Sequence, residues 1–431
     1  MNNDQSIQLT DRQSWRQIFK AISSNGLGAF GFGIFEYGIS FMLLHATNSP
    51  LSFGMGITIS PLMSLLFFIP IGNFVDNHDH KRIIFWGFML RIVGFIALAL
   101  SLPWFKGVGL LIPVGLFVAV DSLLVNLRNT AYSASIRQLV NGDMVPKLTS
   151  YNTAIASASR ILAPVFGVIL YSLISVEGLI AIEVVVTMIA MLIMMTLQFH
   201  GVAPRESTVH SESQLRQFKE AIHYMKKRPF IRDTIIAEIV VNFFFTAVVT
   251  GSPFIIVNEL HLSNQTVAII ETGYSVGYLL GSVLTSLLKS QHRFASRILT
   301  SLVLVGVALT GLGVTFAVSR SALIVGIFGF LLAMLMDFAF AIFDLAIEIR
   351  LQSTVHTRIL GRVSSTLYTA SFAIMPVGTL VYTGLFDAFG QGSYILIISG
   401  VILIAYALGS ISLFTRDIKK DDQFIQRARN K

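Results

Sequence analysis

Apolar segments of about twenty residues recur along the whole chain, separated by short polar segments. A helix needs about 20 consecutive apolar residues to cross a bilayer. Short segments of alternating hydrophobicity, which predict a transmembrane β-barrel, are missing from the sequence. The pattern therefore predicts an all-α membrane protein with twelve transmembrane helices. The predicted spans are residues 20–46, 51–75, 82–101, 107–136, 148–173, 177–199, 232–258, 264–288, 295–318, 321–349, 358–386 and 391–414.

The composition agrees with this pattern. Of the 431 residues, 54% are hydrophobic and 13% are charged, whereas a soluble domain carries about 25% charged residues. A soluble protein of this size has no interior large enough to bury so many apolar side chains. The composition therefore excludes an ordinary soluble globule. The first 17 residues are polar and mixed in charge, which is not the pattern of a cleaved signal peptide.

The distribution of Lys and Arg predicts the orientation of the chain in the membrane. If the N-terminus lies inside the cell, 26 of the 31 basic residues fall on the inner side. Only Lys106 and Arg320 then lie in outer loops, and three arginines fall within spans: Arg91, Arg128 and Arg160. This asymmetry predicts a multi-pass protein of the cell membrane with both termini in the cytoplasm. It also explains the net charge of +8 without nucleic-acid binding.

The chain divides into two halves that resemble each other. The longest polar stretch, residues 200–231, predicts a central cytoplasmic linker between an N-terminal six-helix bundle, residues 1–199, and a C-terminal one, residues 232–431. Two parallel repeats with a site between them are typical of transporters that work by alternating access. Four positions recur at offsets of 212 or 213 residues: Arg137 and Arg350, Leu148 and Leu360, Asn152 and Ser364, Pro164 and Pro376.

The loop between the second and third spans carries a candidate gate. Gly72 is followed four residues later by Asp76, and Lys81 and Arg82 begin the next span. An acidic side chain here can accept hydrogen bonds from a helix N-terminus or an arginine. We expect such a contact to form in one conformation and to break in the other.

Five ionisable residues inside spans are the candidates for proton coupling. Charged side chains are costly in the bilayer and mark functional sites. A carboxyl group in a low-dielectric cavity can exchange a proton near neutral pH. Asp121 and Arg128 are seven residues apart, as are Asp337 and Asp344, so each pair shares one helix face. The candidates are Glu36, Asp121, Arg128, Asp337 and Asp344.

Other polar or small residues in the spans are interpreted as structural. Arg91 is expected to pair statically with acids of the first bundle. Glu183 and Glu238 are placed near helix ends, where hydration is cheap. Gly273, Gly277 and Gly281 recur every four residues and predict close helix packing.

The sequence offers no chemistry for an enzyme. It contains no Walker phosphate loop and no GxSxG nucleophile motif. The chain has no cysteine, which excludes thiolate metal sites and disulfides. His78 and His80 have no further candidate metal ligand clustered with them. We therefore expect no cofactor and no metal, and a proton gradient as the energy source.

The motifs resemble those of the major facilitator superfamily. The loop with Gly72, Asp76, Lys81 and Arg82 fits the family pattern, although Asn77 stands where the family usually has a basic residue. A narrower resemblance is to the branch of macrolide-efflux and siderophore-export proteins. It rests on Thr47-Asn48-Ser49-Pro50, Met144-Val145-Pro146, Asn152, Pro164-Val165-Phe166-Gly167, Gln352, Gly361-Arg362-Val363-Ser364 and Pro376-Val377-Gly378. The antiporter motif of the fifth span normally carries glycine before the proline, and Ala163 replaces it here.

The resemblance implies the major facilitator fold, with a central cavity lined by spans one, four, seven and ten. It implies proton-coupled export, by antiport, of amphipathic small molecules or drugs. Uptake of a nutrient or metabolite by proton symport is the alternative on the same fold, and a membrane enzyme or lipid scramblase is a third. The expected partners are the amphipathic substrate, protons and membrane lipids, with no nucleic acid. The sequence is compatible with a monomer and does not decide the oligomeric state.

Overall fold

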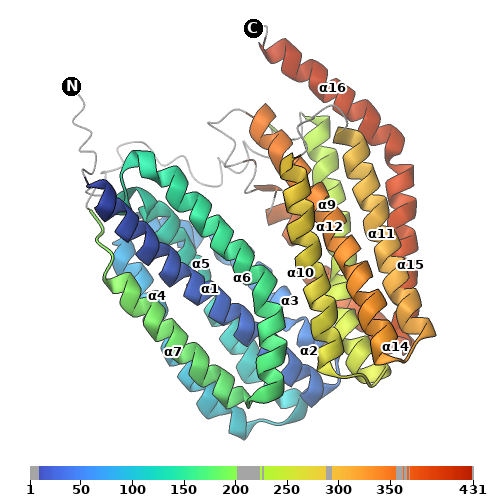
Figure 1. Ribbon diagram of the computed structural model, residues 1–431, viewed down its shortest axis with the longest axis horizontal. Coiled ribbons are helices and arrows are strands. Elements are labelled where there is room, and N and C mark those ends of the chain that lie inside the picture. Colours follow the sequence, from blue (N-terminus) through green and yellow to red (C-terminus); the bar gives the residue numbers. More distant parts are fainter. Residues whose placement is uncertain are drawn as a thin grey trace. The chain divides into compact units, whose positions relative to one another are not determined.

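The structure is a computed structural model that describes residues 9–200, 224–225, 228–287, 294–355, 363, 366–367 and 369–429. Within these residues every regular element is a helix, which confirms the all-α prediction (Figure 1). The helices are α1 Asp11–Thr47, α2 Pro50–Phe53, α3 Met55–Asp76, α4 His80–Ser101, α5 Leu111–Leu139, α6 Val145–Leu173, α7 Val176–Met195, α9 Pro229–Phe254, α10 Asn264–Leu287, α11 Phe294–Val318, α12 Ala322–Thr354, α14 Met375–Phe389, α15 Gly392–Gly409 and α16 Ile411–Arg429.

Each predicted span overlaps one or more of these helices. Within the described residues, ten helices are long and apolar enough to cross a membrane. The other two predicted spans, residues 51–75 and 148–173, fall on α2 with α3 and on α6. The count of twelve crossings therefore stays a prediction. Many apolar side chains lie on the surface, such as Leu100 at 70% and Leu173 at 73% exposure, as a surface in contact with lipid requires.

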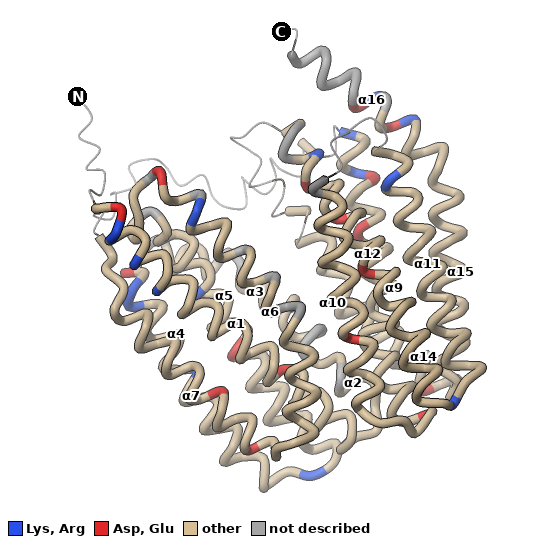
Figure 2. The backbone as a smooth tube through the Cα atoms, viewed as in Figure 1, with Lys and Arg blue, Asp and Glu red and all other residues tan. Residues whose placement is uncertain are grey.

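The last predicted span is too long. Residues 391–414 were expected to form one helix, but α15 ends at Gly409 and α16 begins at Ile411. Arg416 and Asp417 lie in the second turn of α16, and charged side chains are costly in hydrocarbon. Figure 2 shows charged positions on α16, in contrast to the long uncharged stretches along α15.

The chain forms two compact units. Unit 1 consists of Met1–Thr47 and Leu62–Ser211, and unit 2 consists of Asn48–Pro61 and Glu212–Lys431. Most of the predicted linker, residues 200–231, lies outside the described residues. Unit 2 thus includes a short segment from the beginning of the chain, which carries α2 and the first turns of α3.

In unit 1, α1 packs against α6 and α7, and α4 packs against α5 and α7. Local sequence signals set the helix ends. Asp79 caps α4, because its Oδ1 accepts a hydrogen bond from the backbone N–H of Arg82 at 2.8 Å. Ser175 caps α7 in the same way through the N–H of Gly178. Residues from α1, α4, α5, α6 and α7 share one apolar core, which positions the site described below.

In unit 2, α10 packs directly against the backbone of α12. A Cβ atom on Gly273, Gly277 or Gly281 would overlap a carbonyl oxygen of α12, at Phe330, Met334 or Phe338. The predicted role of the three glycines in close packing is confirmed. Each step of four residues along α10 corresponds to a step of four residues along α12, so the two helices are parallel where these contacts form.

The amphipathic helix α16 is joined to the rest of unit 2 by a buried ion pair. Nε and Nη2 of Arg228 donate to the two carboxylate oxygens of Asp421, at 2.7 and 2.6 Å. Both side chains are fully buried. Arg350, at the end of α12, donates to the same carboxylate at 3.2 Å. One acid of α16 thus holds two arginines of unit 2.

Candidate functional site

A buried ion triad lies at the centre of unit 1. Arg91 of α4 lies 3.0 Å from Asp121 of α5 and 3.1 Å from Glu183 of α7. All three side chains are at most 2% exposed. The guanidinium also faces the ring of Phe32, with 4.9 Å to its centroid. Such a triad is favourable only while all its members are present, because each isolated buried charge is costly.

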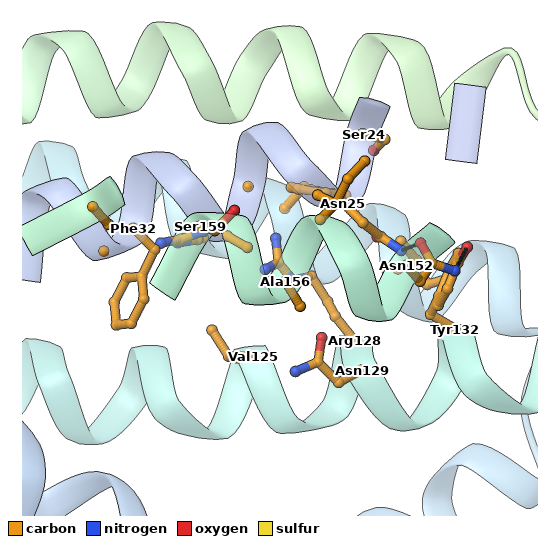
Figure 3. A pocket seen from close by; sticks show the side chains of 18 of the residues that line it. Ser24, Asn25, Phe32, Val125, Arg128, Asn129, Tyr132, Asn152, Ala156 and Ser159 are labelled. Carbon is orange, nitrogen blue, oxygen red and sulfur yellow. Dashed lines mark hydrogen bonds between the residues drawn. The ribbon is translucent and has the colours of Figure 1, made fainter. Parts of the chain in front are cut away.

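A cavity of about 730 Å³ lies between α1, α4, α5 and α6 of unit 1. This volume lies within the usual range for small-molecule sites. Figure 3 shows Asn152 beside Tyr132 at one end of the cavity and Phe32 towards the other, with Arg128 between them. The lining combines aromatic rings, amides, hydroxyls and three charged groups: Glu36, Arg91 and Arg128.

Arg128 does not form an ion pair within the described part of the chain. Its guanidinium faces the ring of Phe88, with 4.2 Å to the centroid. Its Nη1 is buried and has no hydrogen-bond partner among the described residues. Its stem lies against Gly87, where a Cβ atom would come within 2.5 Å of Cγ of Arg128. The sequence placed Arg128 and Asp121 on one helix face, but Asp121 pairs with Arg91 instead.

Glu36 lines the cavity from α1 and is half-buried. The carboxylate forms no ion pair or side-chain hydrogen bond within the residues that the structure describes. Two neighbouring carboxylates, Asp121 and Glu183, share Arg91. Glu36 is therefore the acid of this cavity that is available to a solute or a proton.

Amides and a phenol close one end of the cavity. The amide of Asn25 donates to Oδ1 of Asn152 at 3.3 Å. The amide of Asn152 donates to the hydroxyl of Tyr132 at 2.8 Å. This chain of hydrogen bonds joins α1, α6 and α5. Asn152, one of the residues that carried the narrower resemblance, is thus part of the cavity wall.

The candidate acids of the C-terminal half belong to unit 2. Asp344 accepts a hydrogen bond from the hydroxyl of Tyr278 at 3.4 Å. Asp337 has a buried Oδ1 without a hydrogen-bond partner among the described residues. Glu238 was expected in a hydrated helix end, but the residue is only 3% exposed. Its Oε1 is also buried and has no hydrogen-bond partner among the described residues. This expectation was wrong because α9 is covered by neighbouring helices at that turn.

The candidate gating residues between the second and third predicted spans lie on α3 and α4, on either side of the turn that joins these helices. Gly72 lies within α3, and Asp76 ends that helix, with its side chain outside the described residues. Lys81 donates through Nζ to the carbonyl oxygens of Met195 and Leu197, at 3.2 and 2.8 Å. Arg82 is exposed. The described contacts thus tie this loop to the end of α7, and the gating role stays a prediction.

The proline and glycine motifs of the fifth and eleventh spans are only partly described. Pro164 lies inside α6 and lines the cavity. Gly167 allows α6 to approach α1, since a Cβ atom there would lie 2.9 Å from the carbonyl oxygen of Ile34. Pro376 occupies the first turn of α14. Gly361 and Arg362 lie outside the described residues.

Sequence reasoning missed the role of Glu183, which it placed near a helix end. A usable signal was present in the spacing. The buried residues of α7 include Ile180, Glu183, Thr187, Ala190 and Met194, which follow the helical period. Glu183 therefore belongs to the inward face of α7, where an acid needs a partner. The prediction that Arg91 pairs with acids of the first bundle is confirmed.

Comparison with known proteins agrees with this architecture. The family model described as Major Facilitator Superfamily matches residues 22–379. Macrolide efflux protein A of Streptococcus pyogenes is 21% identical over 403 residues, which cover 92% of this chain and 95% of that protein. Macrolide efflux protein A of Enterococcus faecalis is 22% identical over 269 residues, covering 59% of this chain and 80% of that protein.

Solved structures share the fold at low sequence identity. A mutant form of the nucleoside transporter NupG aligns with a TM-score of 0.69 at 13% identity, covering 93% of this chain and 99% of that one. A D-xylose-proton symporter aligns with a TM-score of 0.69 at 13% identity, covering 91% and 96%. The chain is a multi-pass membrane transporter and not an enzyme, and it belongs to the Major Facilitator Superfamily.

Proposed function

We propose that the protein exports amphipathic small molecules in exchange for protons. In this cycle an outside proton binds Glu36, displaces the substrate, and leaves to the cytoplasm after the transporter has changed its access. The protein needs no cofactor for this, because the proton gradient supplies the energy. The charge asymmetry of the loops supports an orientation with both termini in the cytoplasm.

The observation that carries this proposal is the difference between Glu36 and its neighbours. Asp121 and Glu183 have a cationic partner within 3.1 Å. Glu36 lines the same cavity, and no ion pair holds it in the described part of the chain. A carboxylate with no fixed partner can bind either a proton or a cationic solute, but not both. Competition for one acid is the simplest form of antiport.

Two further features support export of amphipathic solutes. The cavity combines aromatic walls, such as Phe32 and Phe88, with polar groups, a lining that suits amphipathic molecules. The curated relatives are named for macrolide efflux, and one of them covers 92% of this chain. Hydrophobic drugs are therefore the first compounds to test.

Uptake by proton symport is the second candidate. The observation in its favour is the number of amides and hydroxyls in the cavity, among them Asn25, Asn129, Asn152 and Tyr132. A symporter of polar metabolites needs such groups to replace the hydration of its substrate. The two functions differ in how proton binding affects the affinity for substrate. In antiport a bound proton weakens substrate binding, and in symport it strengthens substrate binding.

Reconstituted proteoliposomes test the proposal directly. A pH gradient is imposed across the vesicle membrane, and the flux of a fluorescent hydrophobic drug is followed together with the internal pH. Antiport predicts drug flux opposite to proton flux, and no gradient-driven flux with Glu36→Gln. Drug and protons that move in the same direction would establish symport instead, and full coupled flux in Glu36→Gln would remove Glu36 from the mechanism.

A matched control separates the loss of the Glu36 carboxylate from the effect of a Glu→Gln change outside the cavity. Glu177 lies at the exposed first turn of α7 and is not part of the cavity. Glu177→Gln makes the same chemical change and should leave coupled flux unchanged. Growth inhibition by a panel of compounds, with and without expression, then identifies the substrates.

A further inference from the structure

The cavity of unit 1 holds two charges of opposite sign that no residue of the described chain neutralises by direct contact. Glu36 is the negative one, and Arg128 is the positive one. Arg91 is the other arginine that lines the cavity, and it is already engaged by Asp121 and Glu183. A guanidinium has five N–H donors, and leaving a buried donor without an acceptor is costly.

The neighbours of Arg128 leave its guanidinium with an N–H donor that has no acceptor among the described residues. One face of the guanidinium is covered by Phe88. The stem lies against Gly87, where the absence of a Cβ atom makes room for it. Arg128 lines the cavity itself, and its Nη1 is buried without an acceptor among the described residues. A bound carboxylate would complete this site, because a carboxylate matches the fork of a guanidinium.

Arg128 and Glu36 lie at different levels along helix α1. Arg128 faces Phe88, and a Cβ atom on Gly28 would lie 4.0 Å from the same ring. Arg128 is therefore near the level of Gly28 on α1. Glu36 is eight residues further along that helix, which corresponds to roughly 12 Å. The wall of α1 between these two levels includes Ala29 and Phe32 and is largely apolar.

We propose that the cavity binds an amphipathic zwitterion, with its anionic oxygens on Arg128 and its cationic group at Glu36. This inference rests on the proposed function and names its substrate class. A purely cationic substrate would leave Arg128 without an acceptor, and a purely anionic one would meet the charge of Glu36. A zwitterion with its charges at opposite ends of an apolar body satisfies both residues. Its cationic end competes with a proton for Glu36, as antiport requires.

Ciprofloxacin and two derivatives form a matched set of probes. The parent compound is a fluorescent zwitterion with a carboxylate and a piperazinium group at opposite ends of a rigid aromatic system. Its ethyl ester keeps only the positive charge, and its N-acetyl derivative keeps only the negative charge. Binding of each probe to the purified full-length protein is measured in detergent at constant pH, without any gradient.

The wild-type protein should bind the parent compound at least about tenfold more tightly than either derivative, since each loses one charge-assisted contact. In Arg128→Gln the affinity for the parent should fall to that for the ester, while the ester itself is unaffected. In Glu36→Gln the affinity for the parent should fall to that for the N-acetyl derivative. Arg320→Gln, an exposed arginine in the loop before α12, serves as the control and should change nothing.

Several results would overturn the inference. Equal affinity of the wild type for the parent and the ester would make the site one for cations, and equal affinity for the parent and the N-acetyl derivative would make it one for anions. No binding of the parent would also refute it. If Arg128→Gln does not fold, Arg128→Lys keeps the charge but loses the fork, and an unchanged preference for the parent would count against the proposal. These binding results are independent of gradient-driven flux, so the inference and the proposed function can fail separately.

Discussion

No side chain fits on Gly31, because a Cβ atom there would overlap Oε2 of Glu183 and lie 2.9 Å from Cγ1 of Val186. Glycine at this position lets α1 approach α7 at the level of the ion triad. Glu183 in turn holds Arg91 at 3.1 Å. The missing side chain of Gly31 thus leaves the space that the carboxylate of Glu183 occupies beside Arg91.

Gly31→Val should therefore displace Glu183 from Arg91 and destabilise the protein. Overpacking of a close contact costs about 1–3 kcal/mol, and loss of the ion pair adds to this cost. The melting temperature in detergent is the measurement. Gly384→Ala is the matched control, because a Cβ atom on that residue of α14 meets nothing within 4 Å. Equal melting temperatures for the two variants would contradict the role of Gly31.

Arg91→Met should be among the most damaging substitutions in the chain. It leaves Asp121 and Glu183 buried without their cation, and breaking a buried pair in this way costs about 3–5 kcal/mol. Adding Asp121→Asn and Glu183→Gln to Arg91→Met removes both charges and should restore much of the stability. Thermal unfolding of the single and triple variants tests this coupling, and a triple variant less stable than Arg91→Met would refute it.

Gly277→Ala should loosen the contact between α10 and α12. A Cβ atom on Gly277 would overlap the carbonyl oxygen of Met334, and a backbone atom cannot move aside as a side chain can. We expect a loss of about 1–3 kcal/mol. Gly409→Ala, where nothing lies within 4 Å, is the control. The urea midpoint of the two variants gives the comparison, and the contact is unimportant if both match the wild type.

Asp421→Asn should loosen α16 from the rest of unit 2. The substitution leaves Arg228 and Arg350 without the carboxylate that both contact, and a neutral amide cannot accept from them as strongly. The chain has no cysteine, so a single spin label at Leu413→Cys reports the mobility of α16. The label should become more mobile in Asp421→Asn. The exposed Asp387, tested as Asp387→Asn, should leave its mobility unchanged.

The attachment of α16 should also respond to acid. Asp417 joins α16 to α9, because Nη2 of Arg232 donates to its carboxylate at 3.1 Å. The guanidinium of Arg416, whose Nε donates to Asp417 at 3.0 Å, lowers the pKa of that carboxyl below its ordinary value of 3.8. A lowered pKa contributes stability above the unfolded-state value, and this contribution is lost as the pH falls through the folded-state value. The spin label on α16 should therefore be unaffected between about pH 5 and 8 and become mobile only below about pH 4. Release near pH 6 would point to another group.

The helices of the membrane region could be predicted from the sequence because hydrocarbon permits only continuous apolar segments there. Glu36 and Asp121 were found by the same rule, since a charge inside such a segment is conspicuous. The all-α fold and the helix positions follow from composition along the chain. Helix packing was predictable only where small residues repeat, as at Gly273, Gly277 and Gly281.

The pairing of charges could not be predicted, because it depends on which helices meet. The spacing of Asp121 and Arg128 suggested a relation within α5. In the structure Asp121 instead meets Arg91 of α4, which also holds Glu183 of α7. Three residues from three helices form one network, and no pattern within a single helix encodes it.

Residues 48–61 group with unit 2 although the chain on both sides of them groups with unit 1. Asn48 accepts a hydrogen bond from Asn258, and Gly54 lies where a Cβ atom would contact Thr250 and Thr379. A fragment that ends within the central linker would therefore carry this segment without the surface that receives it. A fragment that begins there would lack part of its own interior. Co-expression of the two halves should therefore recover more folded second half than its expression alone, because unit 2 takes residues 48–61 from the first half of the chain.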